Sequence, residues 1–356
     1  MNTLKDNFFR PIDYLRLSVT DRCNLRCIYC MPSGGVSPSK YSEILKYEEI
    51  IRIVEIAAGL GVGKVRLTGG EPLRRKNIAF LISSIKKIAG IDDLSMTTNG
   101  ILLEKYSEEI AAAGLDRINV SIDSINADRY GEITRGGDLP TVLRGVDAAK
   151  KAGLHPVKIN MVPMRGINDD EILDFARLTM DTDYHVRFIE FMPSGSVDFW
   201  NPERYITTDE VKRVIETIAP LSPVRIRTNG PSRYFRLEGA VGVIGFISAL
   251  THHFCEDCNR IRLTADGKLK PCLFTETEID LRSPIRSGAP DSELARLIRL
   301  SVEVKPGGHT IGEQRPNSPA NPGNQDVSCR NNNAAGKADI AALLSGRRRP
   351  MSKIGG

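Results

Sequence analysis

The stretch DRCNLRCIYCMP (residues 21–32) places three thiols close together, at Cys23, Cys27 and Cys30. Their C-x3-C-x2-C spacing does not suit structural zinc, which takes four closed ligands that usually come as two pairs. An iron–sulfur cube has four irons, so three thiolates leave one iron without a protein ligand. This open iron is able to chelate a small molecule that carries an amine and a carboxylate. We therefore expect a cluster whose open corner is functional.

A second cysteine triplet, Cys255, Cys258 and Cys272, has the spacing C-x2-C-x13-C. The spacing alone is compatible with two kinds of site. One is another iron–sulfur cube with an open corner, and the other is a closed zinc knuckle that His252 or His253 completes. Two such triplets in one chain indicate metal chemistry rather than scattered thiols.

The composition narrows the class of protein. Lys and Arg number 49 against 44 Asp and Glu, and the net charge of +5 is too small to indicate nucleic-acid binding. It suits an anionic small molecule if arginines converge on one site. The longest apolar run, residues 241–250, is shorter than the roughly 20 residues of a membrane span, and the N-terminus lacks a signal-peptide pattern. We expect a cytoplasmic protein with reduced thiols, in which Cys329 is a bystander in a Gly/Asn/Pro-rich tail.

Short β-branched segments alternate with amphipathic patterns through the first two-thirds of the chain. The predicted strands cover residues 15–19, 64–68, 94–98, 117–122, 157–162 and 186–191. The predicted helices between them cover residues 47–61, 77–90, 104–114 and 141–153, and several end in Gly. Six strand–helix units predict an α/β fold, a partial (βα)6 TIM-like barrel with a parallel sheet. The strand pattern leaves an open doubly wound sheet as the alternative.

The carboxyl ends of the predicted strands are polar. They read SVTDRC, RLTGGEP, TTNG, SIDS, INMVP and EFMPSG. In a barrel the carboxyl edge is where ligands bind, so these residues are expected to surround one mouth. Loops are polar in general, which explains part of the pattern, but it does not explain a cysteine triplet on the first of these loops.

The organisation of the chain changes after the predicted barrel. We expect three parts: a barrel over residues 1–220, a smaller C-terminal iron–sulfur domain over 221–304, and a low-complexity tail over 305–356. The second part shows short strands with hairpin turns, including ADG at 265–267, and then a helix around 291–300. Residues 305–346 are rich in Gly, Pro, Asn, Ser and Ala and are expected to be largely disordered.

Arg16 and Arg66 lie in the first two predicted strands, inside the barrel or at its mouth. A buried guanidinium needs an anionic partner, and phosphates accept its forked donors in a bidentate way. The structural alternative is an internal ion pair with a carboxylate such as Glu71 or Glu190.

The cysteine loop resembles that of the radical S-adenosylmethionine (SAM) enzymes, since an aromatic residue, Tyr29, precedes the last cysteine. In that superfamily a segment like TGGEP (68–72) lines the methionine part of SAM, and its glycines let the backbone approach the ligand. More closely, the chain resembles the GTP 3′,8-cyclases over residues 10–300 and again at the terminal IGG. The segments that carry this likeness are LRLSVTDRCNLRCIYCMP, KVRLTGGEPLRR, TTNG, RINVSID, VKINMV, RFIEFMP and FCEDCNRIRLTADGKLKPCLF.

The resemblance implies roles for individual residues. The first triplet is implied to hold a 4Fe–4S cluster that binds SAM, and the second triplet a 4Fe–4S cluster that faces the guanine base. The residues implied to contact SAM are Tyr29, Gly70, Ser121 and Met192. Those implied to bind GTP are Arg16, Arg66, Thr97 (at the border with SAM), Lys158, Arg260 and Arg262. A catalytic role is implied for Arg16 and for Gly355 and Gly356, which reach into the active site.

The resemblance also implies the reaction and its partners. A reduced cluster cleaves SAM to a 5′-deoxyadenosyl radical, which takes hydrogen from the ribose 3′ carbon of GTP, and the new radical attacks guanine carbon 8. This is the first step of molybdenum-cofactor biosynthesis. The implied partners are GTP, an electron donor such as flavodoxin or ferredoxin, and the cyclic pyranopterin monophosphate synthase that follows in the pathway. We expect a monomer or homodimer that binds neither nucleic acid nor membranes.

Two other functions compete with this interpretation. A radical SAM dehydrogenase that modifies a peptide also uses auxiliary clusters, but it should carry a leader-binding module and more than three auxiliary cysteines. The sequence shows neither feature. A non-enzymatic iron–sulfur sensor needs neither the TGGEP segment nor converging arginines, and it does not cleave SAM.

Overall fold

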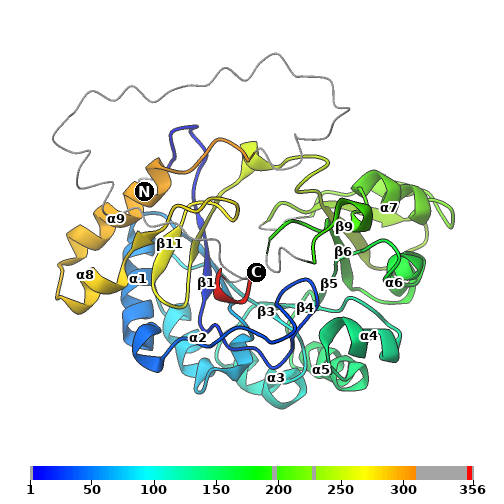
Figure 1. Cartoon of the computed structure of the whole chain (residues 1–356), viewed down its shortest axis with the longest axis horizontal. Helices are drawn as coiled ribbons and strands as arrows, with labels where there is room; N and C mark the ends of the chain where they lie inside the picture. The colour runs from blue at the N-terminus through cyan, green and yellow to red at the C-terminus, as the bar shows by residue number, and fades with distance from the viewer. Residues whose placement is uncertain (1–2, 195–198, 227–229, 310–350, 355–356) are drawn as a thin grey trace.

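The centre of the molecule is a curved, barrel-like sheet (Figure 1). A computed structural model of the chain describes residues 3–194, 199–226, 230–309 and 351–354. Six parallel strands lie side by side in chain order: β1 (Tyr14–Ser18), β2 (Lys64–Thr68), β3 (Asp93–Thr98), β4 (Arg117–Ser121), β5 (Lys158–Met161) and β6 (His185–Ile189). Chain neighbours are also sheet neighbours, which confirms the partial barrel and excludes a doubly wound sheet, in which the strand order reverses.

Helices cover the outer face of this sheet (Figure 1). They are α1 (Tyr47–Gly59), α2 (Ile78–Lys86), α3 (Leu103–Ala112), α4 (Ala127–Thr134), α5 (Leu139–Lys151), α6 (Ile172–Asp181) and α7 (Thr208–Ile215). Strand side chains alternate between the two faces. Leu15 and Leu17 therefore join the hydrophobic core, whereas Arg16 between them lines an inner cavity. None of the described helices combines the length and the apolar character needed to span a membrane.

Local signals set the helix ends. The carboxylate of Asp138 accepts a hydrogen bond from the Thr141 N–H and so caps α5, and the helix ends just before Gly153, whose φ is +83°. α1 ends at Gly59, two residues earlier than predicted. The reason is Gly61, which adopts a left-handed φ of +103°.

The strands that follow residue 220 extend the same sheet at both edges. At one edge β6 pairs in parallel with β9 (Val243–Ile247), which continues to the antiparallel strands β8 (Arg233–Leu237) and β7 (Leu221–Pro223). At the other edge β1 pairs in parallel with β10 (Arg260–Leu263), which continues to β11 (Lys268–Lys270) and β12 (Ile279–Asp280). The antiparallel β10–β11 pair confirms the hairpin predicted at 265–267. The domain boundary at 221 stays a prediction of the sequence.

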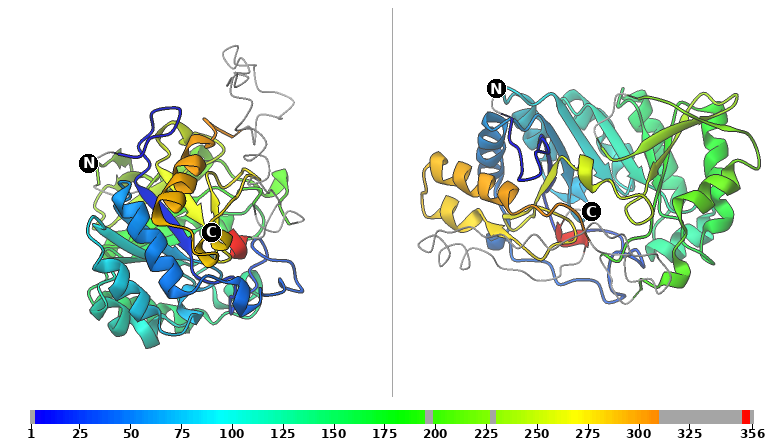
Figure 2. Two further views of the ribbon diagram at one scale, coloured as in Figure 1. Left: turned by 90° about the vertical axis from the view of Figure 1, so that its left-hand side faces the viewer. Right: turned by 90° about the horizontal axis from the view of Figure 1, so that it is seen from above.

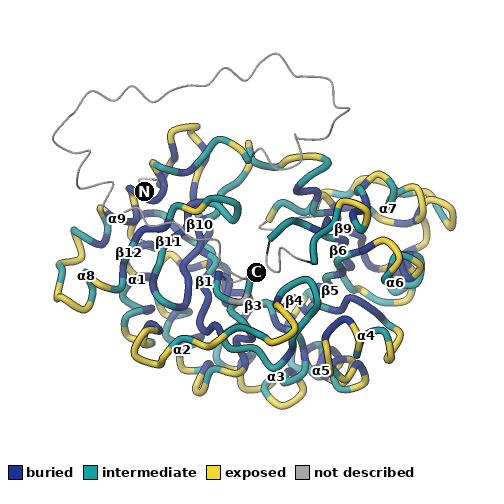
Figure 3. The backbone as a smooth tube through the Cα atoms, in the orientation of Figure 1, coloured by how far each residue is buried: buried dark blue, intermediate teal, exposed yellow. Residues whose placement is uncertain are grey.

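The described chain ends in three helices: α8 (Arg282–Arg286), α9 (Asp291–Glu303) and α11 (Met351–Ile354). α9 packs beside α1, and α11 lies near the concave side of the sheet (Figure 2). The prediction that disorder begins at residue 305 is wrong for residues 305–309, because Lys305 is 3% exposed and belongs to the packed interior. Along the backbone, the strands of the central sheet are largely buried, whereas the outer helices carry exposed positions (Figure 3). The remainder of the predicted disordered segment, with Cys329, lies outside the described residues.

Candidate active site

The first cysteine triplet lies on the loop that follows β1. Cys23, Cys27 and Cys30 line one cavity on the inner face of the sheet. The Cys30 N–H donates to the Cys27 carbonyl at 2.9 Å, and the Leu25 N–H lies 3.4 Å from the Cys23 sulfur, so the loop backbone orients these residues. Burial raises the pKa of the Cys23 and Cys27 thiols. Both thiols therefore hold their protons until a metal ion displaces them.

The glycine pair of TGGEP packs this loop against the end of β2. A Cβ atom on Gly69 would lie 2.4 Å from the Thr20 carbonyl oxygen, and one on Gly70 would lie 2.4 Å from that of Arg22. Hydrogen bonds join the two segments, from the Gly70 N–H to Thr20 at 2.6 Å and from the Glu71 N–H to Arg22 at 2.8 Å. The need for glycine thus comes from a neighbouring backbone. Gly70 also lines the cavity, and its contact with SAM stays a prediction.

Two buried carboxyl groups, Glu71 and Asp123, lie near the first triplet, and Asp123 lines the same cavity. Glu71 accepts hydrogen bonds from the Thr98 hydroxyl and the Asn99 N–H, both at 2.7 Å, and burial raises its pKa to about 7. Asp123 accepts a hydrogen bond from the Tyr29 phenol at 2.7 Å, and burial raises its pKa to about 6. This side of the cavity therefore carries acidic groups that titrate near neutral pH.

The glutamates considered as ion-pair partners of the strand arginines have other partners. Besides the contacts of Glu71 described above, Glu190 accepts the Thr208 hydroxyl at 3.0 Å and the Leu250 N–H at 2.7 Å. Hydroxyl and amide donors thus surround both carboxylates. Arg66 donates its Nε–H to the Ser95 hydroxyl at 3.1 Å, and an external anion as the partner of Arg16 and Arg66 stays a prediction.

A row of arginines crosses three neighbouring strands. The register places Arg16 opposite Arg262 of β10 on one side and opposite Arg66 of β2 on the other. These three line the cavity together with Arg187 and Arg260. Burial, and after it repulsion from Arg262, lowers the pKa of Arg16; burial and repulsion from Arg260 lower the pKa of Arg262 to about 10. Like charges buried side by side cost free energy, which a polyanion in the cavity offsets.

Lys158 lies deeper in the barrel than the predicted phosphate site. It is 2% exposed and is two residues before Asn160, the β5 residue that lines the cavity. Its ammonium nitrogen lies 5.8 Å from the centre of the Tyr234 ring. Burial, followed by repulsion from Arg187, lowers its pKa to about 6. As far as the described residues define the cavity wall, Lys158 is not part of it, and its contact with GTP stays a prediction.

The second cysteine triplet lines the same cavity, in a cationic setting. The Lys305 ammonium lies 3.5 Å from the Cys258 sulfur and donates to the Arg260 and Pro271 carbonyl oxygens at 2.8 and 2.7 Å. The Arg260 guanidinium lies 4.0 Å from the same sulfur. Burial alone raises the pKa of the Cys258 thiol, but Arg260 and Lys305 outweigh burial and lower it to about 6. Cys258 is therefore held ready as a thiolate, the form that binds iron.

The distances between the thiols distinguish a 4Fe–4S cluster from a site for a single zinc ion. Zn–S bonds of about 2.3 Å bring the ligands of one tetrahedral ion within about 4 Å of one another. In the part of the chain that the structure describes, the only three metal-ligating residues whose ligand atoms lie within 4.8 Å are His253, Cys255 and His309. In neither cysteine triplet do all three sulfur atoms lie within 4.8 Å of one another, and larger separations suit a cluster of four irons. His252, the other knuckle candidate, lies 3.0 Å from Asp209 instead.

Most of the predicted site residues meet in this one cavity. They are Arg16, Tyr29, Arg66, Gly70, Thr97, Ser121, Met192, Arg260, Arg262 and the six cysteines of the two triplets. Gly355 and Gly356 lie outside the described residues, although Met351, in the short helix that precedes them, lines the cavity.

The cavity also contains residues to which the sequence assigned no role. They are Asn99, Asp123, Asn160, Arg187, Lys305 and His309, among others. Asp123 and Asn160 belong to the polar strand ends SIDS and INMVP, so the strand-end pattern marked their place without their function. Lys305 and His309 belong to KPGGH (305–309), which resembles the family pattern, but they follow the last predicted helix in a segment expected to be disordered and were given no role.

Solved structures share this fold. The chain is similar to SuiB of Streptococcus suis bound to S-adenosylmethionine, with a TM-score of 0.57 and 14% identity over 82% of this chain and 68% of that one. It is also similar to SuiB bound to the precursor peptide SuiA, with a TM-score of 0.54 and 14% identity over 74% of this chain and 60% of that one. At this identity the likeness concerns the fold alone.

Sequence relatives identify the family. The Radical SAM superfamily model matches residues 17–179, and the Molybdenum Cofactor Synthesis C model matches residues 184–311. The chain is 52% identical over 307 residues to the GTP 3′,8-cyclase of Thermodesulfovibrio yellowstonii, covering 86% of this chain and 95% of that protein. It is 50% identical over 312 residues to the GTP 3′,8-cyclase of Pelotomaculum thermopropionicum, covering 87% and 96%. Two cysteine triplets on one cavity, a radical SAM fold and these relatives agree, and the chain belongs to the GTP 3′,8-cyclase family.

Proposed function

We propose that this protein converts GTP to (8S)-3′,8-cyclo-7,8-dihydroguanosine 5′-triphosphate in a SAM-dependent radical reaction, the first step of molybdenum-cofactor biosynthesis. One observation carries the proposal: two cysteine triplets line one cavity, the first beside carboxyl groups and the second beside cationic side chains. The names of the relatives support it, since they are GTP 3′,8-cyclases along nearly their whole length.

The acidic side of the cavity suits SAM. SAM carries a positive sulfonium and an ammonium group, and near the first triplet the cavity is lined by Asp123 and the Tyr29 phenol, with Glu71 buried beside Cys23. Carboxylates beside a cation lower its free energy in a buried site. The hydrogen bond from Tyr29 to Asp123 fixes the aromatic ring that precedes Cys30, so we assign this pair to the positioning of SAM.

The basic side suits the triphosphate of GTP. Arg16, Arg66 and Arg262 form the row described above, and Arg187 and Arg260 line the same cavity. Guanidinium groups bind phosphate oxygens through two parallel hydrogen bonds, so a row of them fixes position as well as charge.

The two thiol triplets fit two 4Fe–4S clusters, each with an open corner. Cys23, Cys27 and Cys30 would hold the N-terminal cluster, which would supply the electron for SAM cleavage when bound and reduced. The polypeptide would bind and orient the two substrates so that the ribose 3′ hydrogen of GTP lies next to the 5′ carbon of SAM, and it would exclude water from the cavity. Gly355 and Gly356 are proposed to complete the wall beyond Met351, because residues without side chains allow close approach to a substrate.

We extend the proposal to partners and location. Cluster reduction calls for a one-electron donor of the flavodoxin or ferredoxin type, and cyclic pyranopterin monophosphate synthase consumes the product. Six free thiols at the site call for a reducing compartment, which supports the cytoplasm. The enzyme is proposed to act as a monomer or homodimer.

The test is anaerobic reconstitution followed by reductant and SAM, with and without GTP. We expect 5′-deoxyadenosine formation to increase with GTP and to match the amount of cyclised nucleotide. An equal amount of SAM cleavage with and without GTP would count against the proposal. In the Cys255→Ala variant the first cluster should persist while cyclised product disappears, and an unchanged product yield would refute the role of the second triplet.

A further inference from the structure

We propose that His253, Cys255 and His309 form a binding site for a single zinc-class divalent ion, available when the second iron–sulfur cluster is absent. One ligand atom from each residue lies within 4.8 Å of the other two. No other set of described His, Cys, Asp and Glu residues is this tight. Small changes in side-chain rotation bring such a set to the separations of a tetrahedral ion, whose bonds are about 2.0–2.3 Å long.

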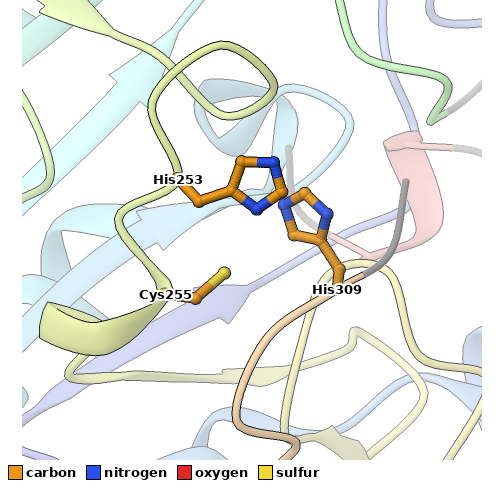
Figure 4. A group of neighbouring side chains, drawn as sticks. All are labelled: His253, Cys255 and His309. Carbon is orange, nitrogen blue, oxygen red and sulfur yellow. The ribbon is translucent and has the colours of Figure 1, made fainter. Parts of the chain in front are cut away.

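The site is built from two segments that are distant in the sequence. His253 and Cys255 come from the loop between β9 and β10, and His309 comes from the segment after α9; the side chains point toward one another (Figure 4). The imidazole rings of His253 and His309 are stacked, with centroids 4.5 Å apart and planes 29° apart. Phe274 packs edge-on against His309 at 4.4 Å. Aromatic packing thus holds two imidazole rings beside one thiol.

The donor set selects the class of ion. Two imidazoles and one thiolate suit zinc and its borderline neighbours, whereas magnesium and calcium require oxygen ligands. Three protein ligands leave the fourth tetrahedral position for water, so the site is an open one.

Competition with the second cluster follows from the shared ligand. Cys255 belongs to both sets, whereas Cys258 and Cys272 belong only to the triplet. One thiolate in this position cannot hold an iron corner and a separate ion, so zinc in the chain before cluster assembly excludes the second cluster. The competition rests on the function proposed above, but the binding of the ion does not.

Cobalt is the probe for the site, because a tetrahedral Co²⁺ thiolate complex absorbs visible light. We titrate the full-length, cluster-free, reduced protein with Co²⁺ and then with Zn²⁺. The wild type should bind one Co²⁺ per chain at this site, and Zn²⁺ should displace it. His253→Ala, His309→Ala and Cys255→Ser should each lose the thiolate absorption at equimolar metal.

Matched variants distinguish this site from a zinc knuckle. Cys258→Ser and Cys272→Ser should keep the Co²⁺ spectrum, and so should His252→Ala, which removes the neighbouring histidine that faces Asp209. Loss of Co²⁺ binding in Cys258→Ser or Cys272→Ser, or its survival in His309→Ala with an unchanged melting temperature, would overturn the proposal.

Iron uptake measures the competition directly. Preloading the wild type with one Zn²⁺ should lower the iron content after reconstitution from about eight to about four per chain, as two cubes become one. His309→Ala should take up about eight irons with or without zinc. If zinc leaves wild-type iron uptake unchanged, the two sites do not compete. Cyclase activity is measured on zinc-free enzyme, so a failure of the proposed function is recognised separately.

Discussion

The two cysteine triplets offer the same number of thiols in opposite electrostatic surroundings. Around the first, burial raises the pKa of Cys23 and Cys27, and the nearby groups are the carboxyls of Glu71 and Asp123. Around the second, Arg260 and Lys305 lower the pKa of Cys258 to about 6. The ligand count alone therefore does not decide what each open corner meets. We propose that the charge of the surrounding wall decides it and directs a cationic co-substrate to one side and an anionic nucleotide to the other.

The strongest test of this comparison removes one thiol from each side. Cys27→Ala and Cys258→Ala should each lower the iron content from about eight to about four per chain. We expect Cys27→Ala to abolish 5′-deoxyadenosine, whereas Cys258→Ala should retain SAM cleavage and lose cyclised product. Iron analysis and chromatography of both products measure this. The same product pattern in both variants would mean that the triplets do not have separate roles.

Removing a cation from the basic wall should have the next largest effect. Arg262→Leu leaves the row of arginines incomplete, and we expect GTP binding to weaken about 100-fold, since losing one partner of a buried charge pair costs about 2–5 kcal/mol. SAM affinity should hardly change. Arg262→Lys should restore only part of the affinity, because lysine lacks the bidentate fork. Calorimetry with each ligand measures the two affinities, and equal losses for both would contradict a division of the wall by charge.

The lowered pKa of Lys158 predicts a pH dependence. With a pKa of about 6 when folded and 10.5 when unfolded, the unfolded chain binds the extra proton between these values. Stability therefore rises with pH across this window, and the contribution is lost as the pH falls toward 6. Lys158→Met should remove this slope and be more stable than the wild type at pH 7. Urea unfolding at several pH values measures it.

Two further measurements complete the test of Lys158. Lys150→Met is the control, because Lys150 is a surface lysine paired with Asp183 and its removal should keep the slope. If the triphosphate reaches Lys158, GTP binding at pH 8 should also take up a proton, which calorimetry in two buffers detects. An unchanged slope in Lys158→Met would show that this lysine is charged in the folded protein.

Lys305 should have the smallest and most selective effect. Its ammonium lies 3.5 Å from the Cys258 sulfur, so Lys305→Gln should shift the midpoint potential of the second cluster to more negative values and leave the first unchanged. Lys270→Gln is the matched control, since Lys270 is equally buried but donates to the Thr275 carbonyl. Redox titration followed by electron paramagnetic resonance separates the clusters. A shift in both clusters, or in the control, would contradict a local effect.

The sequence predicted the scaffold well because its signals are local. Strand bounds agree within one or two residues, since β-branched runs and terminal glycines act on their own neighbourhood. The polar strand ends also marked the cavity mouth correctly. What the sequence missed depends on contacts between distant segments. Lys305 lies beside Cys258 and Pro271 only because distant segments fold together, and the KPGGH pattern at 305–309 does not indicate these contacts.

The sequence also did not indicate how deep a side chain lies inside the barrel. Strand alternation assigns Lys158 to the inner face, but it does not say how far below the mouth the side chain lies. Arg187 was placed correctly in a strand and received no role, because its partners, the side-chain oxygens of Asn160 and Asn119, lie on other strands.

The parallel pairing of β10 with β1 fixes the separation between the two cysteine triplets. β1 leads into the loop of Cys23, and β10 follows Cys258; the two strands are hydrogen-bonded with Tyr14 opposite Arg260 and Leu17 opposite Leu263. Slipping this pair by one residue would turn Arg260 and Arg262 to the far face. Main-chain hydrogen bonds thus set the distance between the two triplets. This distance should therefore stay the same when many residues of the outer helices are substituted.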